Sequence, residues 1–254
     1  MSEAHYSNPA YVSQVAKNEV NLATTYIEGP AMAGLTPDLT GKDVLSIACG
    51  AGAECERFSA LGAASVLGVD RVPGLIDIAR QEHAGPGIEF QVMDMRNLQL
   101  PDESRDFAYS SKAMHYVEDW RTVLDPLRRI LRPGGSFLLS AHHPVTWGME
   151  LTKEPNLQRR LLGYEFDPAT TEITTYGSYL TAGPREEQTA ELTVSYYHKP
   201  LSDIFREIRE SGFNLAAFEE PGISDEVLDK YPRRVYEMFS KFPLFMVMLL
   251  EKVD

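Results

Sequence analysis

Short apolar segments alternate with helical segments along this chain, which predicts an α/β fold built on a parallel sheet. The clearest unit runs from Val44 to Asp70. Residues 44–48 have the character of a buried strand, a turn of small residues follows, and residues 54–61 have helical spacing. A second apolar run, 64–69, ends at Asp70. A strand–turn–helix–strand unit with a carboxylate at the tip of its second strand is typical of nucleotide-binding sheets.

The turn that contains Gly50 and Gly52 has the properties of a ligand site. Glycine lets the backbone approach a ligand where a Cβ atom would collide. The helix that follows begins with free amide groups, which favour an anionic group such as a carboxylate. A carboxylate such as Asp70 can accept both hydroxyls of a ribose. Dinucleotide folds carry a third glycine where this chain has Cys55, so the sequence disfavours a pyrophosphate ligand.

The composition predicts one soluble globular domain with insertions. The chain has 254 residues, of which 43% are hydrophobic and 24% charged. A formal net charge of −13 without a local basic cluster argues against a nucleic-acid or membrane partner and favours a small substrate. The N-terminus is polar, and the longest apolar run, 244–250, is too short to span a membrane. We therefore expect a cytoplasmic protein.

The two cysteines, Cys49 and Cys55, flank the glycine turn. Small residues that pack beside the turn in a reducing compartment are the favoured interpretation, and a disulfide between them is the alternative. Their spacing, with no histidine nearby, does not suggest zinc, so we expect no metal site.

Further strands and helices are expected along the rest of the chain. Proline fits the first turn of a helix at 73, and Arg-Pro-Gly-Gly at 132–135 is a helix stop, because glycine adopts left-handed geometry and proline prevents continuation. Gly29-Pro30 is expected to end the first helix. The expected strands are 88–93, 106–111, 136–141, 215–219 and 244–252, and the expected helices are 10–27, 31–35, 73–83, 122–131, 203–210 and one around 234–239.

Several segments resemble the class I S-adenosylmethionine-dependent methyltransferases, and in particular the bacterial small-molecule methyltransferases. The first is SIACGAG at 46–52, which departs from the family pattern at Ser46, where an acidic residue is usual, and at Ala48, where the first glycine is usual. The others are DFAYSSKAMHYVEDW at 106–120, LRRILRPGGSFLLS at 127–140 and HKPLS at 198–202. The resemblance is strong over about 40–145 and moderate over 198–254.

The resemblance implies a Rossmann-like α/β fold with helices on both faces of a seven-stranded, mostly parallel sheet. The implied strand order is 3-2-1-4-5-7-6, with the last strand antiparallel. We expect an N-terminal helical cap at 1–40, a cofactor-binding core at 41–145, a lid insertion after strand five at 146–199 and the completion of the core sheet at 200–254. Residues 172–181 and 188–198 alternate like two antiparallel strands. We interpret the insertion as a lid over the acceptor pocket. A dimerisation surface is the alternative, which leaves both a monomer and a homodimer open.

The resemblance also implies S-adenosyl-L-methionine as cofactor and S-adenosyl-L-homocysteine as its product. The resemblance implies that Asp70 holds the ribose and Asp94 the adenine amino group; the two lie 24 positions apart at the tips of successive expected strands. Two solvated loop aspartates are the alternative. The other residues expected to bind the cofactor are Tyr11, Ala48, Cys49, Gly50, Gly52, Arg71, Met95, Ser110 and Ser111.

The expected function is transfer of a methyl group to a small-molecule acceptor by in-line displacement, in which alignment of the reactants is the main task of the protein. A general base is needed only for an acceptor that is protonated at neutral pH. His115, His142 and His143 are the candidate catalytic residues, because they follow the expected strands and histidine titrates in the right range. Each could equally be a packed residue. A non-catalytic cofactor-binding protein, which Ser46 favours, and a nicotinamide-dependent oxidoreductase are the alternatives.

Overall fold

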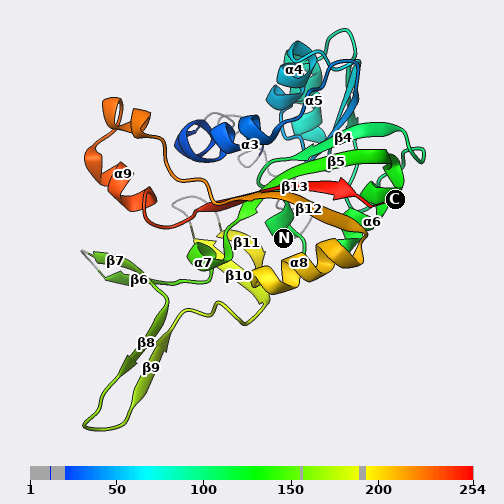
Figure 1. Cartoon of the computed structure of the whole chain (residues 1–254). Helices are drawn as coiled ribbons and strands as arrows, with labels where there is room; N and C mark the ends of the chain where they lie inside the picture. Colours follow the sequence, from blue (N-terminus) through cyan, green and yellow to red (C-terminus); the bar gives the residue numbers. More distant parts are fainter. Residues whose placement is uncertain (1–11, 13–20, 155–156, 189–192, 254) are drawn as a thin grey trace.

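A seven-stranded sheet forms the centre of the computed structural model, which describes residues 12, 21–154, 157–188 and 193–253 (Figure 1). The strand order across the sheet is β12-β13-β5-β4-β1-β2-β3. The strands are β1 (Asp43–Ile47), β2 (Ser65–Asp70), β3 (Ile88–Val92), β4 (Arg105–Ser110), β5 (Leu131–His142), β12 (Phe213–Glu219) and β13 (Phe245–Lys252). Strand β13 pairs antiparallel with β5 and β12, and the other pairs are parallel. This arrangement confirms the predicted order 3-2-1-4-5-7-6.

The central strands are apolar on both faces because helices cover both sides of the sheet. Alternate residues of β1 point to opposite faces. Val44 packs in a cluster with residues of α3 (Gly29–Leu35), α4 (Ala53–Ala60) and α5 (Pro73–Glu82). Leu45 packs on the other face with residues of α6 (Arg121–Ile130) and α8 (Leu201–Glu210). The sheet therefore has one buried core on each face, and its strand tips are left to carry polar groups.

The chain passes from α6 into the sheet through an irregular start of β5. Leu131 pairs with Arg105, and the next paired residue of β5 is Ser136. The Arg-Pro-Gly-Gly segment lies between them, and Gly134 has a left-handed φ of 72°. The segment ends the helix as predicted, and the strand that follows begins at Leu131, earlier than the predicted residue 136.

The N-terminal helical region does not end at Gly29-Pro30 as the sequence analysis expected. A π-helical turn, η1 (Thr24–Glu28), continues directly into α3, in which Pro30 occupies the first turn. The Gly29 N–H donates to the carbonyl oxygen of Thr24, and a Cβ atom at Gly29 would collide with that oxygen. Gly29 is therefore required for a close backbone approach. The expected helix at 10–27 lies mostly outside the described residues.

The insertion after β5 begins with α7 (Pro144–Trp147) and consists mainly of three antiparallel strand pairs. They are β6 (Glu150–Glu154) with β7 (Leu157–Leu161), β8 (Gly163–Phe166) with β9 (Ile173–Tyr176), and β10 (Gly183–Gln188) with β11 (Thr193–His198). The expected strands at 172–181 and 188–198 were wrong in their bounds, because turns divide this region into shorter strands. The β8–β9 hairpin extends away from the body (Figure 1). Short helical turns η2 (Met114–Tyr116) and η3 (Asp225–Asp229) and helix α9 (Arg233–Phe239) complete the structure.

Substitution of Gly29 by alanine tests the close approach in the N-terminal region. We expect Gly29→Ala to lower the free energy of unfolding by about 1–3 kcal/mol, because the new methyl group meets the Thr24 carbonyl. Gly34→Ala, in α3 with open space around the position, should raise it by about 0.5–1 kcal/mol. Urea unfolding of both variants measures the difference, and equal effects would contradict this account.

Candidate functional site

The turn after β1 is joined directly to the tip of β2 through the carboxylate of Asp70. The Gly50 N–H donates to Asp70 Oδ2 at 3.0 Å, and the Val72 N–H donates to Oδ1 at 2.9 Å. Burial raises the pKa of Asp70, and the backbone donors oppose that rise. Each oxygen of an ionised carboxylate can accept more than one hydrogen bond, so Asp70 retains capacity for a ligand hydroxyl.

The backbone of the turn is left-handed at three positions, one of which is not glycine. The φ angles are 52° at Ala48, 58° at Gly50 and 98° at Gly52. A Cβ atom at Gly52 would lie 2.8 Å from the Phe90 ring, so this glycine is required by the packing of β3 against the turn. The sequence analysis placed both glycines beside a ligand. In the structure Gly52 is buried, whereas Ala48, Cys49 and Gly50 are partly exposed.

Asp94 follows β3, next to β2 in the sheet, and its carboxylate is held by Arg96. The Arg96 N–H and Nε donate to Oδ1 at 2.9 Å and 3.0 Å, and Nη2 donates to Oδ2 at 2.6 Å. These bonds lower the pKa of Asp94. The charge of Arg71 lowers the pKa of both Asp70 and Asp94, so the two acids share one electrostatic environment. Arg96 is a partner that the sequence analysis did not identify.

The remaining cofactor candidates have different surroundings. Met95 is half-buried and packs against the core cluster that contains Leu45. Cys49 and Cys55 are not joined by a disulfide, so the disulfide alternative is wrong. Tyr11 lies outside the described residues.

A buried carboxylate that the sequence analysis missed, Glu28, lies over the tips of β4 and β5. Glu28 is 1% exposed, and its Oε1 accepts hydrogen bonds from Ser140 Oγ and, at 2.6 Å, from Ser111 Oγ. Lys112 Nζ is 3.5 Å from its Oε2. Ser110 is fully buried, and its hydroxyl has no partner in the part of the chain that the structure describes. No pattern in the sequence marks Glu28; in the structure it ends the π-helical turn η1, a feature that occurs frequently at functional sites.

Two of the three candidate histidines form a stacked column with Trp147. The ring centroids of His115 and His142 are 3.5 Å apart, and those of His142 and Trp147 are 3.6 Å apart, with near-parallel planes in both pairs. Tyr196 of β11 meets His142 and Trp147 edge-on, at 5.5 Å and 5.1 Å. The column therefore connects the tips of β4 and β5 to the inserted strands.

Both stacked histidines are neutral at neutral pH. Burial lowers the pKa of His115 to about 3, and the charge of Lys112 adds to the effect. Burial also lowers the pKa of His142 well below its usual value, with His115 contributing. The backbone N–H of His142 donates to Nδ1 of the His115 ring at 3.4 Å. Because Nδ1 is an acceptor in this bond, the ring proton of neutral His115 is on Nε2. Within the described residues that nitrogen has no partner, so it can donate to a ligand.

His143 has different partners. Its Nδ1 accepts the Val145 N–H at 3.2 Å and caps α7, and its Nε2 lies 2.9 Å from Glu220 Oε1. It is not among the residues that line the pocket beside the column. The structure thus brings His115 and His142 together and separates His143 from them.

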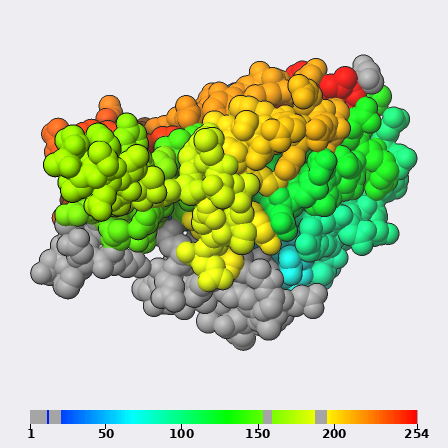
Figure 2. All heavy atoms as spheres, turned by 90° about the horizontal axis from the view of Figure 1, so that it is seen from below, coloured from blue at the N-terminus to red at the C-terminus, as the bar shows by residue number. Residues whose placement is uncertain are grey.

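A narrow pocket with a volume of about 10 Å³, room for about one water molecule, lies between the strand tips and the insertion. Its mostly apolar and aromatic lining consists of His115, Trp120, Ala141, His142, Pro144, Trp147, Tyr196, Tyr197, His198, Lys199, Ile204 and Met246. In the space-filling view the yellow-green atoms of the insertion lie on the same face as the gold atoms of α8 (Figure 2). The lining residues come from the core and from the insertion, so the pocket lies between the two.

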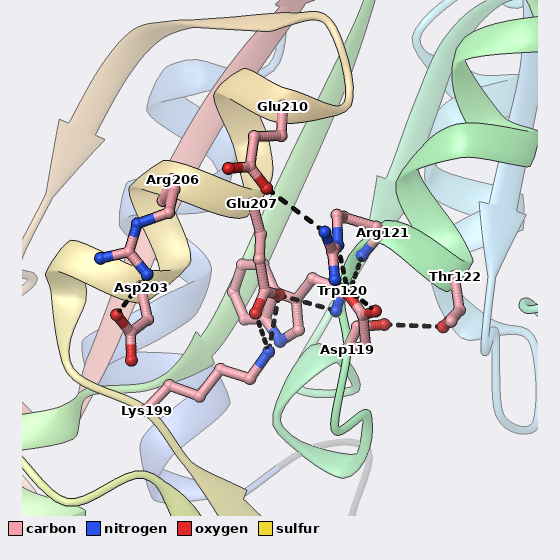
Figure 3. A network of polar contacts seen from close by, with 9 residues as sticks. All are labelled: Asp119, Trp120, Arg121, Thr122, Lys199, Asp203, Arg206, Glu207 and Glu210. Carbon is pink, nitrogen blue, oxygen red and sulfur yellow. Dashed lines mark hydrogen bonds and ion pairs between the residues drawn. The ribbon is translucent and has the colours of Figure 1, made fainter.

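The one lysine in this lining is neutralised by Glu207 of α8. Lys199 Nζ donates to both carboxylate oxygens of Glu207, at 2.5 Å and 2.6 Å (Figure 3). The backbone N–H of Trp120 donates to Glu207 Oε2 at 2.8 Å. Arg121 extends the network to Glu210, 3.3 Å away. The pocket consequently presents neutral hydrogen-bonding groups and aromatic faces, and its single cation is paired.

No helix in the described part of the chain combines the length and apolar character that a membrane span requires. Within the same residues, no group of three or more histidine, cysteine or acidic side chains is arranged to hold a metal ion.

Comparison with known proteins finds a family model that matches the central part of the sheet. Residues 45–139 match the family model described as "Methyltransferase domain". The chain is 25% identical over 208 residues to an uncharacterized protein of Haemophilus influenzae, covering 79% of this chain and 78% of that protein. It is 33% identical over 123 residues to the phthiotriol/phenolphthiotriol dimycocerosates methyltransferase of Mycobacterium tuberculosis, a match that covers 46% of each chain. The matched region therefore covers less than half the length of that named enzyme.

Two solved structures have a similar fold over most of the chain. An S-adenosylmethionine dependent methyltransferase from Mesorhizobium loti aligns with a TM-score of 0.73 and 27% identity, covering 89% of this chain and 97% of that one. A putative S-adenosylmethionine dependent methyltransferase from Listeria monocytogenes gives the same TM-score and coverage at 22% identity. The similarity therefore extends beyond the residues that the family model matches.

The neutral state of His115 predicts a loss of stability in acid. The unfolded chain takes up a proton on this side chain below about pH 6.5, whereas the folded chain does so only near pH 3. The stabilisation is therefore fully present above pH 6.5 and decreases as the pH falls toward 3. We expect His115→Asn to have a shallower acid limb in plots of unfolding free energy against pH, and a limb as steep as that of the wild type would contradict this assignment.

The left-handed alanine in the turn predicts that glycine is better tolerated there. Ala48→Gly should raise the free energy of unfolding by about 0.5–1 kcal/mol, since relief of about 1–2 kcal/mol of backbone strain exceeds the entropic cost of glycine. In the exposed interior of α3, Ala33→Gly should lower it by about 1 kcal/mol. Chemical denaturation compares the two variants, and destabilisation by both would show that Ala48 is unstrained.

Proposed function

We propose, given that the core of this chain belongs to the class I S-adenosylmethionine-dependent methyltransferases, that the protein methylates a small-molecule acceptor held in the pocket beside β4 and β5. The observation that carries the proposal is the Asp70 carboxylate, fixed by the Gly50 N–H at the strand tips that lead to this pocket. The names of two relatives specify a phthiotriol dimycocerosate and a malonyl-[acyl-carrier protein] as methyl acceptors, which supports an acceptor that is not a nucleic acid.

The residues at this edge of the sheet fit the cofactor. Asp70 has acceptor capacity for the ribose hydroxyls, and the partly exposed backbone at 48–50 leaves the turn accessible. We assign Asp94 and Met95 to the adenine and Arg71 to the same end, where its charge acts on both acids. Ser110 and Ser111 are assigned to the methionine end, since the Ser110 hydroxyl is buried without a partner among the described residues.

The bound cofactor supplies a methyl group already activated by the sulfonium, so the protein has mainly to orient the acceptor and to exclude water. His115 can donate a hydrogen bond from Nε2, and Trp147 and Tyr196 provide flat apolar walls. A histidine with a pKa of about 3 is a weak base at neutral pH. This arrangement favours an acceptor whose nucleophilic atom carries no proton at neutral pH, and His143 is left out of the role because it caps α7.

One observation favours a second candidate function, that of a non-catalytic protein that binds the cofactor. Ser46 is buried in β1 where the related pattern has an acid, so that carboxylate is absent from the turn. Formation of S-adenosylhomocysteine with any member of a panel of small acceptors favours the enzyme. Cofactor binding without turnover on the whole panel favours the second candidate.

Calorimetry with S-adenosylhomocysteine tests the assignment of Asp70. The wild type should bind, and Asp70→Asn should weaken binding by about 10–100-fold, because the charge-assisted bonds to the ribose are lost. Asp102→Asn is the matched control, since Asp102 forms an exposed ion pair with Arg129. Near-UV circular dichroism verifies that the variants fold. No binding to the wild type, or full affinity in folded Asp70→Asn, would contradict the proposal.

A further inference from the structure

The β8–β9 hairpin, residues 163–176, is called the arm here, and in the part of the chain that the structure describes nothing covers its apolar face. Among the described strands, its two strands pair only with each other. Tyr164, Phe166 and Ile173 are 74%, 52% and 64% exposed, and Phe166 pairs with Ile173 across the hairpin, so the three side chains share one face. An isolated two-stranded hairpin is marginally stable in water, so an arm of this kind requires a surface to pack against.

The arm is also uniformly acidic. It contains Glu165, Asp167 and Glu172 and no lysine or arginine, which gives it a net charge of −3. A partner surface should therefore combine exposed apolar side chains with positive charge, which is uncommon on a chain whose formal net charge is −13.

The segment 230–242, which contains α9, has both properties. Tyr231, Met238 and Phe242 are 39%, 63% and 54% exposed, and no residue of α9 is buried. The segment has four basic residues and one acidic residue, a net charge of +3. The four basic residues are Lys230, Arg233, Arg234 and Lys241. The α9 segment is therefore complementary to the arm in both charge and apolar character.

The arm and the α9 segment lie on the same side of the molecule, at the left in both views (Figures 1 and 2). A two-fold axis on that side brings the arm of one copy to the α9 segment of the other, and the reverse contact follows by symmetry. We propose that the protein is a homodimer in which each arm packs on the α9 segment of the partner copy. This inference does not depend on the proposed reaction.

The base of the arm continues into the wall of the pocket. The Ser178 N–H donates to the Gly148 carbonyl at 2.8 Å, and the Tyr179 carbonyl lies 2.7 Å from Nε2 of His198, which lines the pocket. An arm held by a second copy therefore holds one wall of the pocket as well.

The mass of the full chain in solution, measured by light scattering during gel filtration over a wide concentration range, tests the proposal. We expect a particle of twice 28.4 kDa. The variant Phe166→Ser/Ile173→Ser should shift the particle to the monomer. The matched control, Leu61→Ser, removes a 46% exposed leucine after α4 and should remain dimeric.

Charge reversal tests which surfaces meet. Glu172→Arg and Arg234→Glu should each raise the dimer dissociation constant by about tenfold or more, because like charges then face each other. The double variant Glu172→Arg/Arg234→Glu should restore a dimer close to the wild type. A monomeric wild type, a dimer unaffected by the arm variants, or a double variant no tighter than the single ones would overturn the proposal, whatever the outcome of the calorimetry above.

Discussion

The hydrogen bond from the Gly50 N–H to the Asp70 carboxylate connects the two parts of the molecule on which the proposed chemistry depends. It fixes the turn after β1 to the tip of β2, at 3.0 Å, and it holds a buried acid with acceptor capacity remaining. Parallel strands end at the same edge of the sheet, so the tips of β3, β4 and β5 lie on the same side. Everything assigned to the cofactor or the acceptor follows from this common edge.

The polar groups at this edge lie in two separate environments. On one side Asp70 and Asp94 are influenced by Arg71, and Asp94 is held by Arg96. On the other side the aromatic column of His115, His142 and Trp147 is neutral, because burial removes the tendency of both histidines to take up a proton. Glu28, which comes from the N-terminal region, is buried over the tips of β4 and β5. This separation is suited to a cationic cofactor bound beside an uncharged pocket.

The strands of the sheet could be predicted because their signals are local, whereas their order in the sheet was implied by the resemblance to a known family. Buried parallel strands are short apolar runs, and the turns between them carry glycine and proline. The insertion was less predictable, since the pairing of β8 with β9 and of β10 with β11 depends on where turns divide a long polar segment. The ends of the N-terminal helices were misjudged at Gly29, where the requirement is a close backbone approach that no local pattern reveals.

The site residues also divide into those that local sequence patterns could place in the fold and those that depend on the three-dimensional packing. Residues at strand tips, such as Asp70, Asp94, His115 and His142, could be placed because topology brings strand ends together. The burial of Glu28 depends on contacts with Ser111 and Ser140, which lie far along the chain, and the stacking of His142 on Trp147 depends on how the short helix α7 folds back after β5. Neither contact leaves a signal in the sequence. His143 adjoins His142 in the sequence, yet the alternation of side chains after β5 turns it toward α7 and Glu220.

The most direct test of the account is a crystal structure of the protein with S-adenosylhomocysteine. The account predicts both ribose hydroxyls within hydrogen-bonding distance of the Asp70 carboxylate, while the Gly50 N–H still donates to it, and the sulfur directed toward the pocket lined by His115 and Trp147. A ligand bound elsewhere, or a ribose with no contact to Asp70, would contradict it.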